Sequence, residues 1–178
     1  MTASADRSPG GGAVARSARR LLDDEVDRKL AAALLADGRS TLKSLAEVTG
    51  LSVSAVQARV RRLEADGIIR GYTALLDSEA IGLPLAALIA ITPLEPAQPD
   101  DAPERLAGLP EIEACHSVAG DDSYVLFVRV ATPTALERLI REIRRRANVS
   151  TRTTVVLQTF FERRAAPWAQ GADTLPPP

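Results

Sequence analysis

A pair of amphipathic stretches joined by a glycine-centred turn constrains the fold of this chain most. Thr41 and Ser52 each precede one stretch. Both suit the N-cap of a helix, because a hydroxyl oxygen there accepts a hydrogen bond from a backbone N–H group of the first turn. Gly50 lies between the stretches, at a position that favours the end of the first helix. The spacing predicts two helices joined by a short turn, which is the helix-turn-helix arrangement.

The apolar side chains around this turn recur with the period of a helix. A supporting helix is predicted from about Asp23 to Asp37, with acidic residues in its first turn, where the helix dipole favours them. Gly67 is expected to end the last of the three helices. The side chains predicted to face the core are Val26, Leu30 and Leu34, then Leu42, Leu45, Ala46 and Val48, then Val56, Val60 and Leu63.

The last of these helices is basic on the side away from its apolar stripe. Ser54, Gln57, Ala58 and Arg61 lie on that side. A recognition helix enters the DNA major groove with its N-terminal residues, and Gln and Arg side chains can read adenine and guanine there. The alternative is a solvated basic helix that pairs with its own acidic residues, Glu64 and Asp66.

Two further arginines, Arg59 and Arg62, flank this side and suit either DNA phosphates or an intramolecular carboxylate. The residues expected to contact DNA are Thr41, Ser52, Ser54, Ala55, Gln57, Ala58, Arg59, Arg61 and Arg62.

The second half of the chain predicts an alternation of strands and helices. Apolar or alternating runs favour strands at 84–92, 111–118, 123–130 and 150–161, with a hairpin turn at 119–122. A short helix fits near 103–109, and Thr132 and Pro133 begin a longer one whose buried face contains Leu136, Leu139, Ile140 and Ile143. The order β-α-β-β-α-β is that of a ferredoxin-like domain. The fold class expected is α+β.

Charge and composition limit the function classes. The net charge is −1, but residues 1–20 carry +3 and residues 77–178 carry −4, which favours a polyanion-binding front end. The start has no apolar run of signal-peptide type, and the longest apolar stretch, 81–94, is too short to span a bilayer. The single cysteine excludes an internal disulfide and suits a reducing compartment. A protein without a membrane partner, located in the cytoplasm, is expected.

The residues that could carry catalysis or bind a metal are few. Cys115 and His116 are each the only residue of their kind, and neighbours on a strand point to opposite faces, so they form neither a dyad nor a shared metal site. Cys115 is expected to be buried, His116 to be structural or at an interface, and Glu111 and Glu113 to lie on a solvated strand edge. The chain also lacks a phosphate loop and a dinucleotide fingerprint. No enzyme activity, metal or cofactor is expected.

Several motifs in order resemble those of one family. The stretch "LDDEVDRKLAAALLADGRSTLKSLAEVTGLSVSAVQARVRRLEADGIIRGYTALLD" resembles the DNA-binding domain of the leucine-responsive regulator/AsnC family, the feast/famine regulators, and the resemblance continues through "ACHSVAGDDSYVLFVRV" to about residue 162. It implies a winged or plain helix-turn-helix domain, a linker strand, and a ferredoxin-like domain that dimerises and senses amino acids.

The family's effector loop, Gly-Asp-x-Asp and an aromatic residue, matches Gly120 to Tyr124. Ser123 stands where many members have the second Asp, so Asp121 or Asp122 would have to supply a carboxylate for an effector's ammonium group. A plain acidic hairpin turn is the alternative. The residues expected to contact an effector are Val118, Ala119, Gly120, Asp121, Asp122, Ser123 and Tyr124.

The sequence therefore predicts a disordered basic tail (1–20) that is solvated or touches DNA, a helix-turn-helix domain (21–71), a linker strand (72–82), a ferredoxin-like domain (83–163) and a disordered polar tail (164–178). The function expected is a sequence-specific DNA-binding transcriptional regulator whose oligomeric state or DNA affinity responds to a small amino acid, controlling amino acid metabolism at the nucleoid. Its partners would be double-stranded DNA, a free amino acid and itself, as a homodimer or higher even oligomer. An architectural DNA-binding protein without an effector is the alternative, and a small metabolite-binding or enzyme module is the third.

Overall fold

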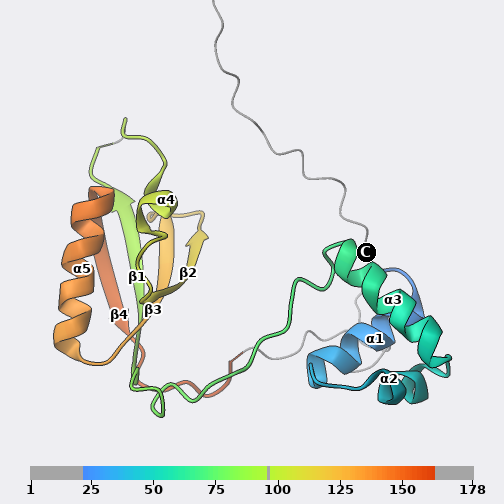
Figure 1. Ribbon diagram of the computed structural model, residues 1–178. Helices are drawn as coiled ribbons and strands as arrows, with labels where there is room; N and C mark the ends of the chain where they lie inside the picture. Colours follow the sequence, from blue (N-terminus) through green and yellow to red (C-terminus); the bar gives the residue numbers. More distant parts are fainter. Residues whose placement is uncertain (1–21, 96, 163–178) are drawn as a thin grey trace, which may run out of the picture. The chain divides into compact units, whose positions relative to one another are not determined.

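The computed structural model describes residues 22–95 and 97–162. Contacts divide the chain into two units, of which the first ends at Thr73 and the second spans Ala74–Glu162. The first unit is helical and the second combines a sheet with two helices (Figure 1). The predicted tails at 1–20 and 164–178 lie outside the described residues.

The first unit contains α1 (Glu25–Ala36), α2 (Leu42–Thr49) and α3 (Val53–Ala65). The predicted caps are confirmed for α2 and α3, since Thr41 Oγ1 accepts from the N–H of Ser44 (3.1 Å) and Ser52 Oγ accepts from the N–H of Ala55 (3.2 Å). Asp24 caps α1 by the same mechanism, so this helix begins slightly later than the sequence predicts.

The turn between α2 and α3 depends on Gly50, whose φ of 71° is a left-handed conformation that glycine adopts without strain. The three helices enclose a core of buried apolar side chains, namely Leu30, Leu45, Ala46, Val56, Val60 and Leu63. Val48 was expected to join this core but is 56% exposed, because it falls outside the α2 stripe that Leu45 and Ala46 define.

The segment between α3 and residue 85 contains no strand, so the linker strand predicted over 72–82 is wrong. Residues 78–82 form a turn instead. The carboxylate of Asp77 accepts from the N–H of Glu79 (2.9 Å) and the carbonyl of Ser78 accepts from the N–H of Leu83 (2.8 Å). These local bonds bend the chain where a strand would have to be extended.

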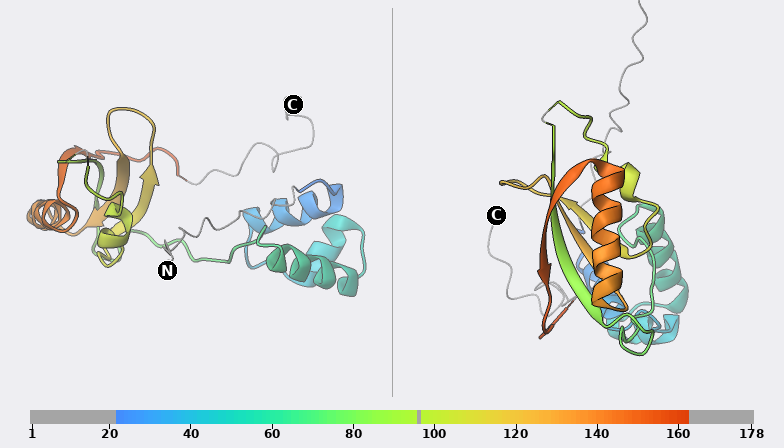
Figure 2. Two further views of the ribbon diagram at one scale, coloured as in Figure 1. Left: turned by 90° about the horizontal axis from the view of Figure 1, so that it is seen from above. Right: turned by 90° about the vertical axis from the view of Figure 1, so that its left-hand side faces the viewer.

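The second unit contains, in order, β1 (Leu85–Pro93), α4 (Ala102–Leu106), β2 (Ile112–Ser117), β3 (Tyr124–Val130), α5 (Pro133–Ala147) and β4 (Val149–Val155). The sheet order is β2-β3-β1-β4, and every neighbouring pair is antiparallel (Figures 1 and 2). This is the ferredoxin-like topology, so the α+β fold predicted from the sequence is confirmed.

Both helices of this unit cover the same face of the sheet. Ile89 and Leu126 from the strands share one buried cluster with Leu106 of α4 and Ile143 of α5. On β3 the buried and half-buried residues alternate, so every second side chain points to the face that no described helix covers. This uncovered side is called the outer face below.

The last strand is shorter than predicted. β4 ends at Val155, whereas the sequence indicates a strand up to residue 161. Its neighbour β1 begins at Leu85, and the ladder ends where Val155 faces Ala87 and the N–H of Val156 donates to the carbonyl of Ala86. The apolar residues that follow, Leu157, Phe160 and Phe161, are exposed.

Cys115 is exposed, so its predicted burial is wrong. It lies on β2, which is the edge strand of the sheet, and all six residues of that strand are exposed or half-buried. A strand at the edge has a neighbour on one side only, which leaves its side chains less covered than those of a central strand.

Candidate nucleic-acid interface and effector pocket

Helix α3 presents a polar face to solvent, as the sequence predicts. Ser54, Gln57, Ala58 and Arg61 are exposed, while Val56 on the opposite side is buried. In the part of the chain that the structure describes, Arg61 forms no ion pair, so the predicted alternative of pairing with Glu64 or Asp66 is not seen. The guanidinium group of Arg61 is therefore available to a ligand.

The remaining predicted residues lie at the start of the two helices. Thr41 and Ser52 are exposed and their hydroxyl oxygens cap α2 and α3, while Ala55 is half-buried. Ser52 Oγ also lies 3.1 Å from Ser54 Oγ, which fixes the polar N-terminal end of α3.

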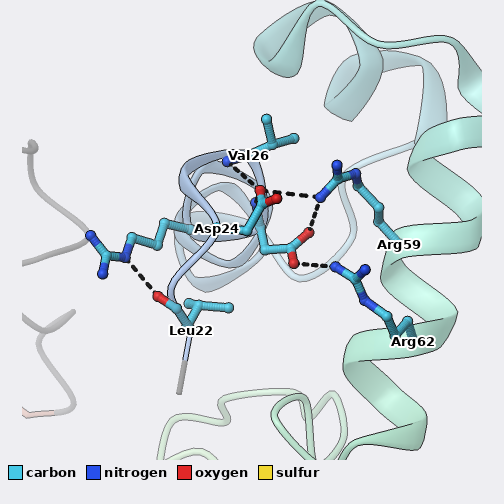
Figure 3. A network of polar contacts seen from close by, with 7 residues as sticks. Leu22, Asp24, Val26, Arg59 and Arg62 are labelled. Atoms are coloured by element: carbon cyan, nitrogen blue, oxygen red, sulfur yellow. Dashed lines mark hydrogen bonds and ion pairs between the residues drawn. The ribbon is translucent and has the colours of Figure 1, made fainter. Parts of the chain in front are cut away.

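Arg59 and Arg62 point to α1 rather than away from the unit (Figure 3). Arg59 Nη1 lies 2.8 Å from Asp27 Oδ1 and 3.1 Å from Asp24 Oδ1, and Arg62 pairs with the second carboxylate oxygen of Asp27. The side chain of Asp27 is only 7% exposed. Of the two predicted alternatives for these arginines, the structure shows the intramolecular carboxylate.

The ion pairs between α1 and α3 favour the charged forms of Asp24 and Arg59. The hydrogen bond from the N–H of Asp27, followed by that from Arg59, holds the pKa of the Asp24 carboxyl below its usual value. The carboxylates of Asp27 and then Asp24 raise the pKa of Arg59. Since the partners come from α1 and α3, the ion pairs join the supporting helix to the helix that presents Gln57 and Arg61.

In the second unit, the loop between β2 and β3 borders a hollow of about 480 Å³, called the effector pocket below. Val118, Ala119, Gly120, Asp122, Ser123 and Tyr124 line it, so the structure brings all but one of the predicted effector residues together. Asp121 is the exception, because it is exposed and does not line the hollow. Pro93, Gln98, Asp100 and Ser117 complete the lining.

The loop leaves several backbone N–H groups without an acceptor in the described part of the chain. Gly120 has a φ of 145°, and no atom lies within 4 Å of where a Cβ would be. Among the described residues, no backbone hydrogen bond is donated by the N–H groups of residues 119–122. An arrangement of open N–H groups beside a glycine suits an anionic oxygen.

Asp122 has its own partners at the pocket rim. Its carboxylate pairs with Arg152 of β4 and lies 3.4 Å from Oγ1 of Thr92, which donates to it. The Asp122 side chain is 20% exposed and that of Arg152 is 73% exposed. The charge of this carboxylate is therefore offset within the chain.

Asp100 faces Tyr124 across the pocket and accepts a hydrogen bond from its hydroxyl group. That bond and burial of the ring raise the pKa of Tyr124 to about 12. Sequence reasoning missed Asp100 and Gln98, since they lie in a Pro-rich segment read only as space for a short helix. The topology offers the signal: β1 and β3 are antiparallel, so the segment after β1 reaches the sheet end where the 118–123 loop lies.

The outer face of the sheet is largely apolar at its centre. Leu88 is 40% exposed, and Phe127 and Thr154 lie opposite it on the neighbouring strands. The Arg129 guanidinium carbon lies 5.2 Å from the centroid of the Phe127 ring, within the range of a cation–π contact. Arg129 also pairs with Glu113, so this glutamate is not simply solvated. His116 is exposed and shares this face with Val125, its register partner.

Among the described residues, no group of three or more His, Cys, Asp or Glu side chains is placed to hold a metal ion. None of the helices in residues 22–95 and 97–162 is long and apolar enough to cross a membrane.

Two family models match the chain, one on each unit. A winged helix-turn-helix DNA-binding model matches residues 23–70, and the model of the Lrp/AsnC ligand binding domain matches residues 86–166. In the first unit, which the winged helix-turn-helix model matches, the described residues form three helices and no strand.

Curated relatives and solved structures agree with these matches. The HTH-type transcriptional regulator LrpA of Mycobacterium tuberculosis is 57% identical over 141 residues, which cover 79% of this chain and 94% of that protein. The leucine-responsive regulatory protein of Escherichia coli is 37% identical over 140 residues, 76% of this chain and 85% of that one. A feast or famine regulatory protein from M. tuberculosis, solved in complex with L-methionine, has a TM-score of 0.79 and 57% identity and covers 80% of this chain and 97% of its own.

These relatives are transcriptional regulators and not enzymes, in agreement with the sequence-based expectation. The resemblance predicted from the motifs is confirmed over both units. The chain belongs to the Lrp/AsnC family of transcriptional regulators.

Proposed function

We propose that this regulator reads DNA with the exposed face of α3 and that a small amino acid, bound in the effector pocket, changes its DNA affinity or oligomeric state. The observation that carries the proposal is the effector pocket itself, where five residues of one loop and Tyr124 line a hollow and four successive N–H groups of the loop are open. We expect this regulator to act in the cytoplasm at the nucleoid, on genes of amino acid metabolism.

Two side chains on α3 are suited to read base edges. Gln57 offers a donor and an acceptor that match adenine, and Arg61 offers two donors that match guanine. Both are exposed, and Ser54 precedes them at the helix end that enters a major groove. We assign Arg59 and Arg62 to holding α3 against α1, because their guanidinium groups pair with Asp27.

The effector pocket is suited to an amino acid because it offers complementary partners for both of its charges. The open N–H groups of residues 119–122 would bind the carboxylate. Carboxylate side chains at the rim would bind the ammonium group. The complex of the M. tuberculosis relative with L-methionine supports this ligand class.

Self-association follows from the outer face. An antiparallel sheet can leave one face to solvent, but that face is then usually polar, whereas Leu88, Ala90, Val125 and Phe127 make this one apolar. A second copy of the sheet would cover these side chains, as a homodimer or within a higher even oligomer. Two copies of α3 would then meet half-sites on one DNA duplex.

The effector can act only by binding one oligomeric or DNA-binding state more tightly than another. Fluorescence anisotropy tests this with the full chain and DNA from upstream of its own gene, at a stated salt concentration, with each amino acid in turn. The expected result is sequence-preferring, salt-sensitive binding that one or a few amino acids shift. Preferential binding that no amino acid changes would overturn the effector role and favour the architectural alternative.

A further inference from the structure

We propose that Asp100 is the side chain that binds the α-ammonium group of the amino acid effector. This inference rests on the proposed function, since it concerns the effector pocket and its ligand. It assigns the ammonium partner to a segment outside the loop 118–124, from the stretch between β1 and α4.

The two aspartates inside the loop are poorly suited to this role. Asp121 does not line the pocket, so it is not among the residues that would surround a ligand bound there. Asp122 lines the pocket but already pairs with Arg152 and accepts from Thr92. A second cation would have to compete with a guanidinium group that pairs at close range.

Asp100 lines the same pocket and has a different kind of partner. Its carboxylate accepts a hydrogen bond from the Tyr124 hydroxyl, which is a neutral donor. No ion pair among the described residues involves Asp100. Asp100 is exposed, so water solvates its carboxylate in the free protein. A ligand ammonium group would therefore not have to displace a cation of the chain in order to pair with it. With a pKa of about 12, the Tyr124 phenol stays protonated well above physiological pH and can donate this hydrogen bond throughout that range.

Gln98 holds this wall of the pocket in place. Its Nε2 donates to the carbonyl of Ala147 at 3.2 Å, and its Oε1 accepts from Nδ2 of Asn148 at 3.0 Å. The N–H of Leu94 donates to the carbonyl of Asn148 at 3.1 Å. These bonds tie the segment before Asp100 to the end of α5. The anionic Asp100 and the open N–H groups of Ala119, Gly120 and Asp122 belong to the lining of one pocket and match the two charges of an amino acid.

The test compares L-methionine with its des-amino analogue, 4-(methylthio)butanoate, by calorimetry on the full chain. The two probes differ only in the ammonium group. Asp100→Asn keeps an oxygen that accepts from Tyr124 but removes the charge. We expect this variant to bind L-methionine about tenfold to a hundredfold more weakly, with the affinity for the analogue unchanged or increased.

Glu104→Gln is the matched control, because it removes the same charge from an exposed position on α4 that does not line the pocket. It should leave both affinities within about twofold of the unmodified protein. Asp121→Asn and Asp122→Asn test the rival carboxylates. If either of them, and not Asp100→Asn, abolishes the preference for the ammonium group, the assignment is overturned.

Failure of the proposed function would look different. If the unmodified protein binds none of the twenty amino acids, the effector role of the pocket fails, and this inference fails with it. The unmodified protein could instead bind L-methionine while Asp100→Asn lowers the affinities for L-methionine and for the analogue equally. The pocket would then be an effector site in which Asp100 only shapes the wall. That result would overturn the inference alone.

Discussion

Asp27 is the charged residue on which the first unit most depends. Its side chain is 7% exposed and accepts from two arginines of α3. Burying a carboxylate is unfavourable unless it is paired, and here two guanidinium groups pair with it. Removing the Asp27 side chain would leave both arginines without their main acceptor. The pairing thus couples the stability of the helical unit to the position of the helix proposed to read DNA.

We expect Asp27→Ala to lower the free energy of unfolding by about 2–3 kcal/mol, less than for a fully buried pair because Arg62 is partly in solvent. Urea unfolding of the full chain, followed by circular dichroism, measures this. Glu25→Gln on the same helix is the control: it breaks an exposed pair with Lys29 and should cost at most about 0.5 kcal/mol. Equal losses for the two variants would show that the Asp27 pairs contribute no more than a surface pair.

Tyr124 gives a prediction about pH. Its folded pKa of about 12 is above the ordinary value of 10.0, first because of the hydrogen bond to Asp100 and then because of burial. Since the neutral phenol is favoured in the folded state, the stability it contributes is complete below about pH 10 and is lost as the pH rises towards about 12. In Tyr72→Phe, which leaves Tyr124 as the only tyrosine, ultraviolet absorbance should titrate near 12. Addition of Asp100→Asn should lower that pKa, and an unchanged titration would contradict the assigned cause.

For single residues, the sequence predicts contacts between residues that are close together along the chain. Thr41 and Ser52 were found because a cap and its N–H partner lie within three residues. Asp27 and Asp100 were missed because their partners lie 32 and 24 residues away along the chain, and only the fold brings them together. The position of Asp27, three residues before the buried Leu30, is a partial signal, since it falls on the core face of the helix.

Helix α3 packs against the rest of its unit with one side and exposes the opposite side to solvent. Its apolar stripe and its paired arginines bind it to the rest of the unit, which leaves the side of Gln57 and Arg61 exposed. Because the side chains on the exposed face make few contacts within the chain, substitutions there should change DNA recognition and leave stability largely intact.

Gln57→Ala or Arg61→Ala should therefore cost about 1–3 kcal/mol in binding to the specific site and little on random DNA. Anisotropy titrations on both duplexes, at matched salt, measure the difference. Lys29→Ala, which removes one positive charge from the exposed side of α1, is the control for Arg61→Ala and should affect both duplexes alike and weakly. Equal losses for Arg61→Ala on the two duplexes would assign Arg61 to phosphate contact.

The strands show why element boundaries were harder to predict than element types. The stretch 150–161 is rich in β-branched and aromatic residues along its whole length, yet β4 stops at Val155 because its neighbour β1 begins at Leu85. The burial of Cys115 was wrong for a related reason, since apolar alternation cannot tell an edge strand from a central one. A strand depends on its neighbours, and these are set by topology.

For the whole molecule, the affinity for DNA depends on how many helix-turn-helix units are linked together. A single helix-turn-helix contacts one half-site, and specific affinity rises steeply when a second is linked to it, because the second binding event is then intramolecular. The apolar outer face of the sheet provides such a link if two copies pair through it. Self-association and DNA affinity should therefore fail together, even when α3 is unchanged.

Leu88→Asp tests this coupling, because it places a carboxylate at the centre of the outer face, between Phe127 and Thr154. Burying that charge against a second apolar sheet would be strongly unfavourable, whereas in a monomer the half-exposed position keeps it in water. Sedimentation should show the variant as a monomer, and anisotropy should show its specific DNA affinity reduced by at least about tenfold. Thr134→Asp introduces the same carboxylate on the helix-covered side, in the first turn of α5 where the helix dipole favours it, and should change neither property. A Leu88→Asp protein that still dimerises would place the interface elsewhere, and a monomer with unchanged specific affinity would separate DNA reading from assembly.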